Sequence, residues 1–289
     1  MKKIALSFVL LDALLANTII SGASNQSVNQ IKNSYDKDTT ENVDIDLTGT
    51  PNGNNGFEDC RPPGNDNSCY SGAIFKDYDT LNLTNNAKLT VNVTAKGNYG
   101  SWAAVFFRGD GGKTYSINGG TFNLNLLSLP DPNSDLPVEG VFITRRRATD
   151  LSVNFNFNSD VNVKATKDFY ITRGIFNVND GNGGYSFNRN TVIDVSQMQI
   201  SKGWKGSGVG FRSITSVGGN GYFYVNYDKN KKTTINRNNI VQLKGDIAVE
   251  QTTTATSEVI LHLTNKQSFL EGRFSLQGQA NAELLLDNG

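Results

Sequence analysis

The chain has 289 residues, of which 27 are basic and 27 acidic, so no basic face of the kind that binds nucleic acid is expected. Hydrophobic residues make up 37 % of it, and 29 Gly and 37 Asn favour short strands and turns over helices. Beyond the N-terminus no segment approaches the roughly 18 consecutive apolar residues of a membrane-spanning helix.

Residues 1–23 have the pattern of a secretory signal peptide. Two lysines follow the first Met, an apolar run extends from Ile4 to Ala16, and Ser21–Ala23 offers small residues for cleavage. Asp12 interrupts the run, and a buried N-terminal helix is the alternative interpretation. Because the run is too short for a retained bilayer anchor, the sequence predicts export to the periplasm.

Residues 24–70 are polar and are expected to form an N-terminal cap with a loop. Cys60 and Cys69 lie in this loop, within CRPPGNDNSC, and an oxidising compartment favours a disulfide between them. Their spacing is not C-x-x-C, and the only histidine is the distant His262. A metal site built from His and Cys is therefore excluded, and no metal or other cofactor is expected.

Residues 71–240 contain a repeated pattern, in which a small and then an aliphatic residue precede a second apolar run. The aliphatic residues are Ile74, Val105, Val141, Ile175 and Val209, and the second runs begin at Leu81, Tyr115, Leu151, Tyr185 and Tyr222. Both sets advance by about 31–37 residues per repeat, which is typical of stacked architectures.

Within the repeats, apolar and polar residues alternate with a period of two. Phe122, Leu124 and Leu126 alternate with Asn123 and Asn125, as half-buried strands require. Three such stretches per repeat predict one coil of a right-handed parallel β-helix, with outward Asn residues forming amide ladders. A β-propeller is the alternative, but its repeats are longer, about 40–50 residues.

Residues 241–289 resemble the late passenger region of classical bacterial autotransporters, the pertactin-like β-helix proteins of type V secretion. The resemblance rests on LKGDIAV, VILHLTNKQSFLEGRF and NAELLLDNG, together with the signal peptide. It implies further β-helix coils and a location at the cell surface or outside the cell. The C-terminal translocator barrel of that family is missing, so a fragment, a truncated gene or one half of a split pair is expected.

The resemblance also implies an adhesin or structural stalk without enzymatic activity, with host-cell surface proteins or glycans as partners. The alternative is a polysaccharide-active enzyme, a lyase or glycoside hydrolase, which needs two carboxylates about 5–10 Å apart. The candidate carboxylates recur in successive repeats and are Asp150, Asp168, Asp180 and Asp194. We interpret them as turn residues, and His262 as an outward strand residue beside inward Val259, Leu261 and Leu263. No catalytic residue is predicted.

Two short motifs are candidate binding residues. Arg108-Gly109-Asp110 is the tripeptide that integrins bind, but the repeat aligns Arg108 with Thr144 and Arg212, at the end of a strand. The triplet Arg145-Arg146-Arg147 could contact acidic polysaccharide or lipid phosphates, since guanidinium groups suit such anions. Turn chemistry is the preferred interpretation of both motifs, because Gly, Asp and charged runs are common at turns.

Overall fold

The computed structural model describes seventeen segments of the chain. They are residues 18–23, 34–35, 43–49, 68–70, 73–74, 80–95, 101–109, 114–128, 138–145, 153–171, 174–178, 182–200, 213–217, 220–227, 238–250, 256–278 and 280–286. Every regular element in them is a β-strand, and every strand pairing between them is parallel. The predicted all-β class is confirmed for these residues.

The described strands form two long sheets and one short pair. The first sheet follows the order β1 (Thr18–Ala23), β3 (Val43–Gly49), β7 (Lys88–Ala95), β9 (Thr114–Ser128), β11 (Val153–Ala165), β14 (Asn182–Phe187), β18 (Asn220–Val225), β21 (Glu258–Leu263) and β24 (Asn281–Leu286), with β6 (Thr80–Asn82) beside β9. A branch of the same sheet leaves β11 through β15 (Thr191–Asp194), β19 (Val241–Lys244) and β22 (Phe269–Glu271).

The second sheet contains strands that lie between those of the first along the chain. Its order is β2 (Ser34–Tyr35), β5 (Ala73–Ile74), β8 (Ser101–Gly109), β10 (Val138–Arg145), β13 (Phe176–Val178), β17 (Thr215–Val217), β20 (Ile247–Glu250) and β23 (Phe274–Gln277), with β4 (Ser68–Tyr70) beside β8. The short pair is β12 (Tyr170–Ile171) with β16 (Gln199–Ile200).

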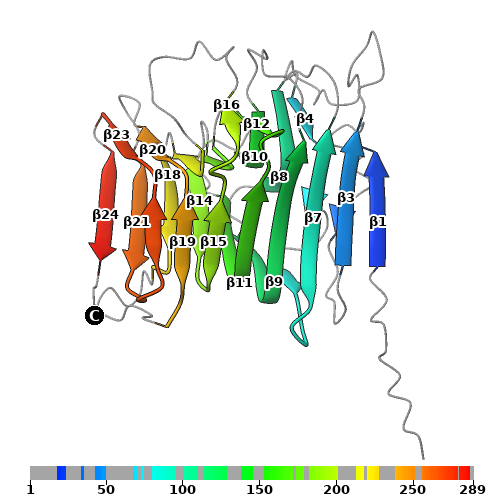
Figure 1. Ribbon diagram of the computed structural model, residues 1–289, viewed down its shortest axis with the longest axis horizontal. Coiled ribbons are helices and arrows are strands. Elements are labelled where there is room, and N and C mark those ends of the chain that lie inside the picture. Colours follow the sequence, from blue (N-terminus) through cyan, green and yellow to red (C-terminus); the bar gives the residue numbers. More distant parts are fainter. Residues whose placement is uncertain are drawn as a thin grey trace, which may run out of the picture.

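The chain therefore alternates between the sheets, and each strand pairs with one about a repeat further on. Figure 1 shows the first sheet as a curled row of strands whose colours follow the sequence from β1 to β24. Residues 114–128 form one long strand, β9, which contains Gly119 and Gly120. Both glycines have positive φ, and an added Cβ would meet the backbone oxygens of Leu83 and Ala87, which lie between β6 and β7.

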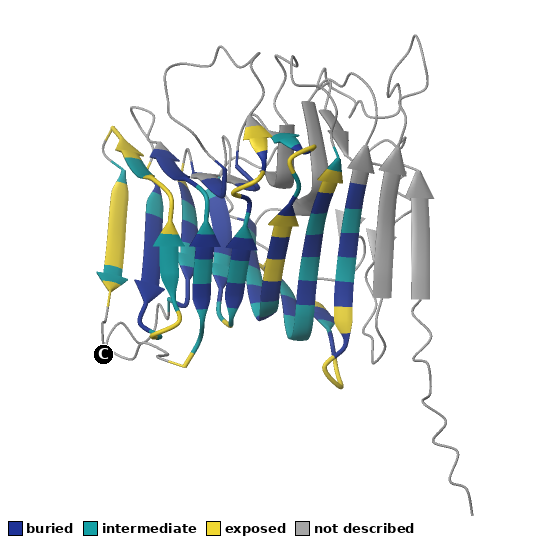
Figure 2. Ribbon diagram, in the orientation of Figure 1, coloured by how far each residue is buried: buried dark blue, intermediate teal, exposed yellow. Residues whose placement is uncertain are grey.

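The core lies on the inner side of the strands. Buried and half-buried residues alternate along β9 and β11, visible as stripes in Figure 2. Phe122, Leu124 and Leu126 are fully buried, as predicted. Aromatic rings dominate the centre, where Phe157 stacks on Phe187 with ring centroids 4.8 Å apart.

The predicted register is correct in part. Val105 pairs with Val141, but Val141 then pairs with Phe176 rather than with Ile175. The reason is packing, because the Phe176 ring makes edge contacts with Phe157 and Phe187 in the core. Toward the N-terminus, Ala73 pairs with Phe106, so Ile74 is not aligned with Val105, and residue 209 lies outside the described residues.

The second set of repeat residues also departs from the predicted alignment, and Leu81 pairs with Ile117 rather than with Tyr115. Tyr115 and Tyr185 both pair with Phe155 and are buried, as expected for an inner row. The next member of this row is Phe223, so the predicted alignment of Tyr222 with Tyr185 is wrong by one residue. In a strand where Tyr and Phe alternate, the ring without a hydroxyl occupies the core and Tyr222 lies on the outer face.

Amide ladders run along the outer side of the first sheet, as predicted. Asn118 donates to Asn82 (3.0 Å), Asn158 to Asn118 (2.9 Å) and Asn188 to Asn158 (2.7 Å), each between residues 30 to 40 apart in sequence. A second ladder contains Thr90, Asn123 and Asn162. Such ladders repeat one hydrogen bond from strand to strand and hold the strands in register.

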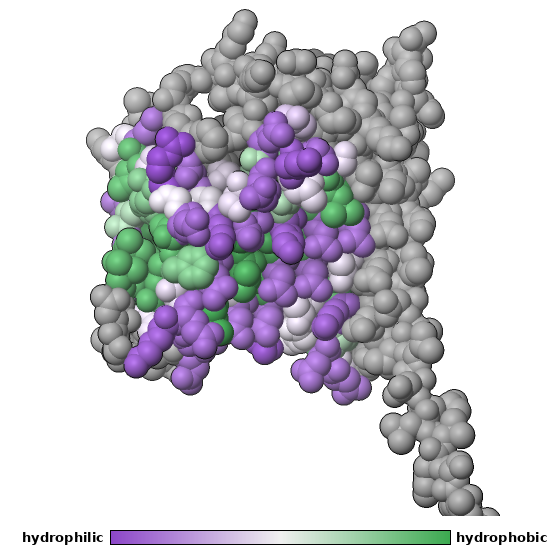
Figure 3. All heavy atoms as spheres, in the orientation of Figure 1, coloured by the Kyte–Doolittle hydropathy of each residue, from purple (hydrophilic) through white to green (hydrophobic). Residues whose placement is uncertain are grey.

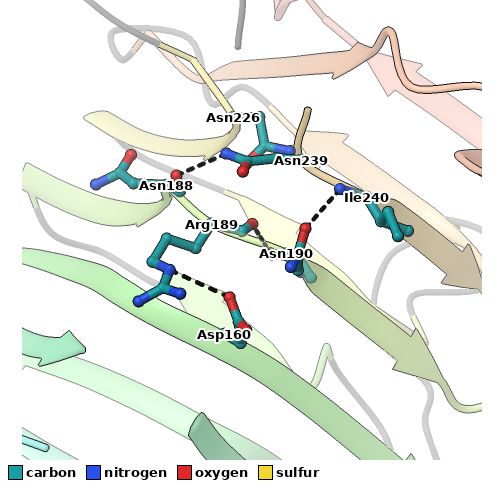
Figure 4. A network of polar contacts seen from close by, with 8 residues as sticks. Asp160, Asn188, Arg189, Asn190, Asn226, Asn239 and Ile240 are labelled. Atoms are coloured by element: carbon teal, nitrogen blue, oxygen red, sulfur yellow. Dashed lines mark hydrogen bonds and ion pairs between the residues drawn. The ribbon is translucent and has the colours of Figure 1, made fainter. Parts of the chain in front are cut away.

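The turn between β14 and β15 continues this polar layer (Figure 4). Asn239 donates its side-chain amide to the carbonyl oxygen of Asn188 at 3.0 Å, and the backbone N–H of Ile240 donates to Asn190 Oδ1 at 2.8 Å. Arg189 forms an ion pair with Asp160 of β11 at 3.2 Å. These contacts join residues of three successive repeats within the first sheet.

The end of the sheets that carries β23 and β24 has a different surface. Leu284 and Leu286 continue the inner rows of Leu261 and Leu263, yet they are 47 % and 56 % exposed. Leu276 of β23 is 49 % exposed. Figure 3 shows hydrophilic surface over the middle of the molecule and hydrophobic surface gathered toward this end.

Candidate binding surface on the outer face of β18 and β21

Three tyrosines form a row on the outer face of β18 and just after it. Tyr222 and Tyr224 stack with ring centroids 4.5 Å apart and an interplanar angle of 16°. Tyr227 follows, with its centroid 4.8 Å from that of Tyr224. All three side chains are half-buried, so each keeps some exposed surface. We refer to these three residues as the tyrosine strip.

The hydroxyl groups of the strip bond to both neighbouring strands. Tyr224 donates its hydroxyl to Glu258 of β21, and Tyr222 forms a side-chain hydrogen bond with Ser186 of β14. Burial raises the pKa of Tyr222 to about 12, although the bond to Ser186 lowers it in part. Burial, followed by the hydrogen bond to Glu258 and its charge, raises the pKa of Tyr224. Both phenols are therefore neutral donors over the whole physiological range.

The strip has room because β14 contributes a glycine beside it. Gly184 is the register partner of Tyr222, and an added Cβ would lie 2.0 Å from the Tyr222 carbonyl oxygen and 2.7 Å from its Cγ. A side chain here would displace both the backbone and the ring of Tyr222. The glycine at position 184 of β14 therefore leaves the space that the Tyr222 ring occupies on the next strand.

His262 closes the row. Its ring makes an edge contact with Tyr227 at 5.6 Å, and its Nε2 lies 3.3 Å from Glu283 Oε1 of β24. The side chain is only 3 % exposed, and Nδ1 has no hydrogen-bond partner. The expected alternation holds, since Leu261 lies on the opposite face, but covering side chains bury the histidine instead of leaving it in solvent.

The charge of this surface is negative. Glu258 and Glu283 lie on its outer face, and strands β14, β18, β21 and β24 contain no Lys or Arg. Such a surface disfavours anionic ligands and favours neutral or cationic ones.

The two sequence motifs meet at the ends of neighbouring strands. Arg108 pairs with Thr144, as the repeat alignment predicts, and Gly109 pairs with Arg145. The backbone therefore brings the start of the RGD tripeptide beside the start of the Arg triplet. Residues 110, 146 and 147 lie outside the described residues, so binding by either motif stays a prediction.

Of the other residues singled out in the sequence, Cys69, Asp168 and Asp194 lie within the described residues. Cys69 lies in β4, in register with Trp102, while Cys60 lies outside the described residues, and the disulfide stays a prediction. Asp168 is exposed in the turn after β11, and Asp194 bonds to Ser196 in the turn after β15. Asp150 and Asp180 lie outside the described residues.

The described residues contain no cluster of three or more His, Cys, Asp or Glu side chains placed to hold a metal ion. In the same residues no helix has the length and hydropathy that crossing a bilayer requires. No protein-family model, curated protein or solved structure matches the chain.

Sequence reasoning did not find the tyrosine strip. The signal was present in Y-F-Y at positions 222–224, where alternation demands that two aromatic residues share the outer face if Phe223 is inside. Aligning Tyr222 with Tyr185 as the start of the second run concealed it. The roles of Glu258 and Glu283 depend on pairing between strands that are distant in sequence, which no local pattern displays.

Proposed function

We propose that the chain is the passenger part of an autotransporter-like surface protein. In this proposal it is a right-handed parallel β-helix, exported through the periplasm to the cell surface or the medium. It acts as an adhesin or rigid stalk without enzymatic activity. Its partners are the translocator that carries it across the outer membrane and, outside the cell, host-cell surface proteins or glycans.

The observation that carries the proposal is the parallel, in-register pairing of successive repeats in both long sheets. Each repeat buries its apolar row against the next, and such stacking produces an elongated and stiff body. The outer layer of Asn side chains is uncharged and self-bonded, which suits a stalk exposed to water. The half-exposed tyrosine strip provides a feature that can adhere.

Export is tested by joining residues 1–23 to a reporter phosphatase that is active only in the periplasm. Activity is expected with the native segment and loss of activity with Leu10→Arg, which interrupts the apolar run. A native segment that leaves the reporter inactive would contradict export.

Adhesion is tested with beads coated with the purified full chain and added to host-cell monolayers. Coated beads should attach more than beads carrying the heat-denatured chain. Attachment at the denatured level would contradict the adhesin role. Incubation with plant and bacterial polysaccharides, followed by measurement of new reducing ends or unsaturated products, tests the absence of enzymatic activity, and cleavage would replace the adhesin with the polysaccharide-active alternative.

A further inference from the structure

We propose that the tyrosine strip, together with Glu258 and Glu283, is a saccharide-binding surface that selects neutral and amino-sugar chains over acidic ones. This deepens the adhesive role proposed above and rests on it for its biological meaning. Binding itself is a property of the purified chain and is tested separately.

The first argument is the rigidity of the rings. Tyr222 is held on one side by Ser186 and Tyr224 on the other by Glu258, and the two rings stack on each other. Tyrosine supplies a large contact area with few rotatable bonds, so little conformational entropy remains to be lost on binding. A surface fixed before the ligand arrives is a feature of binding sites rather than of solvated strands.

The second argument is the chemistry that the surface presents. Pyranose rings pack their C–H faces against aromatic rings and exchange hydrogen bonds with hydroxyl and carboxylate groups at the ring edges. The strip offers aromatic carbon and three phenolic hydroxyls, with the carboxylate of Glu258 beside Tyr224. Asn220 and Asn281 add amide groups at the neighbouring positions of β18 and β24. Polar groups beside aromatic ones fix orientation and specificity in ligand sites.

The third argument is charge. Glu258 is half-buried next to Tyr224, and the Glu283 side chain is 58 % exposed beside the strip. Uronate or sulfate groups would be repelled by these carboxylates, whereas the ammonium group of glucosamine would be attracted. Charge therefore separates this surface from the Arg motifs at β8 and β10, whose sequence suits acidic ligands.

Isothermal titration of the purified full chain with three probes tests the proposal. The probes are a glucosamine oligomer, the N-acetylglucosamine oligomer of equal length and an oligogalacturonate. The expected order of affinity is glucosamine first, N-acetylglucosamine second and no binding of the oligogalacturonate. No binding of the first two probes, or equal binding of the oligogalacturonate, overturns the proposal.

Variants locate the site. Tyr224→Ala and Tyr227→Ala should each lower the affinity for the glucosamine oligomer about tenfold, because exposed aromatic anchors dominate binding energy. Asn123→Ala, on the outer face of β9, is the matched control and should bind as the native chain does. Unchanged affinity in both Tyr variants overturns the proposal.

Two conservative variants test the proposal if the Ala variants fail to fold. Tyr224→Phe keeps the ring and should lose only a few-fold in affinity, whereas Glu258→Gln should lose the preference for glucosamine over N-acetylglucosamine. A preference that survives Glu258→Gln overturns the charge argument. If the saccharides fail to bind while beads still attach to host cells, this proposal fails and adhesion through another surface remains.

Discussion

Strands β9 and β11 and strands β21 and β24 belong to the same parallel sheet but differ on both faces. The first pair is buried on its inner side and carries self-bonded Asn ladders outside. The second pair meets the tyrosine strip and two carboxylates outside, and its inner rows end at the exposed Leu284 and Leu286. The first region bonds its outer Asn side chains to one another from strand to strand, while the second presents half-buried rings and the half-exposed Glu283 to solvent.

The inner side gives the largest expected difference between the regions. Phe157 contacts four other core rings, so Phe157→Ala should lower the free energy of unfolding by about 3–5 kcal/mol. Leu284→Ala, at a half-exposed position, should cost less than about 1 kcal/mol. Urea unfolding followed by circular dichroism measures both. Similar losses would show that the core does not distinguish the two regions.

The polar contacts at the corner between β19 and β20 give the next effect. Asp246 accepts hydrogen bonds from the backbone N–H (2.8 Å) and Nε (3.0 Å) of Arg273, and its own N–H donates to Ser213. Asp246→Ala should cost about 2–3 kcal/mol, because bonds to a largely buried charge are lost. Glu271→Ala is the control, since its pair with Lys244 is exposed and worth less than about 1 kcal/mol. Equal costs in urea unfolding would contradict this assignment.

Much of the inner face could be predicted from sequence, and the reasons are local. Alternation placed Phe122 and Leu124 inside, and the same alternation placed Asn123 and Asn125 outside. Register within a repeat was harder, because both Ile175 and Phe176 are apolar and only ring packing decides which one pairs with Val141.

The candidate surface could not be predicted, for a different physical reason. Its contacts join Ser186, Tyr224, Glu258 and Glu283, which come from four repeats and meet only when the register is known. A one-residue shift moves a side chain to the opposite face, so an alignment that starts the run at Tyr222 instead of Phe223 does not reveal the strip.

High pH should weaken the tyrosine region and spare the Asn ladders. Folding raises the pKa of Tyr222 from 10.0 to about 12, so the folded state favours the neutral phenol. This stability is fully present below pH 10 and is lost as pH rises toward about 12, a change of order 2 kcal/mol. Tyr222→Phe should reduce the alkaline loss in urea titrations at several pH values. An unchanged pH profile in the variant would contradict the buried hydroxyl.

The amide ladders should make a smaller contribution per residue. Asn118 bonds to both Asn82 and Asn158, so Asn118→Ala should cost about 1 kcal/mol in the free energy of unfolding. Asn162 donates a solvent-exposed hydrogen bond to Asn123, so Asn162→Ala should lower the free energy of unfolding by less. Thermal unfolding of the two variants measures the difference, and a larger loss in Asn162→Ala would contradict the ladder arrangement.

The smallest change in the free energy of unfolding is expected on the branch through β15 and β19, where charged side chains take the place of the Asn amides. Lys164, Asp194 and Lys244 are register partners, so opposite charges alternate across three strands. Burial raises the pKa of Asp194. The hydrogen bonds from Ser196 and the charges of the two lysines together lower the pKa by more than burial raises it, so the net shift is downward. This stability is present above the usual carboxyl pKa of 3.8 and is lost as pH falls below that value.

Because the carboxylate is mostly exposed, Asp194→Asn should lower the free energy of unfolding at pH 7 by no more than about 0.5 kcal/mol. The difference should shrink in high salt and disappear in acid, whereas a difference that persists at low pH would show that Asp194 acts through packing and not through charge.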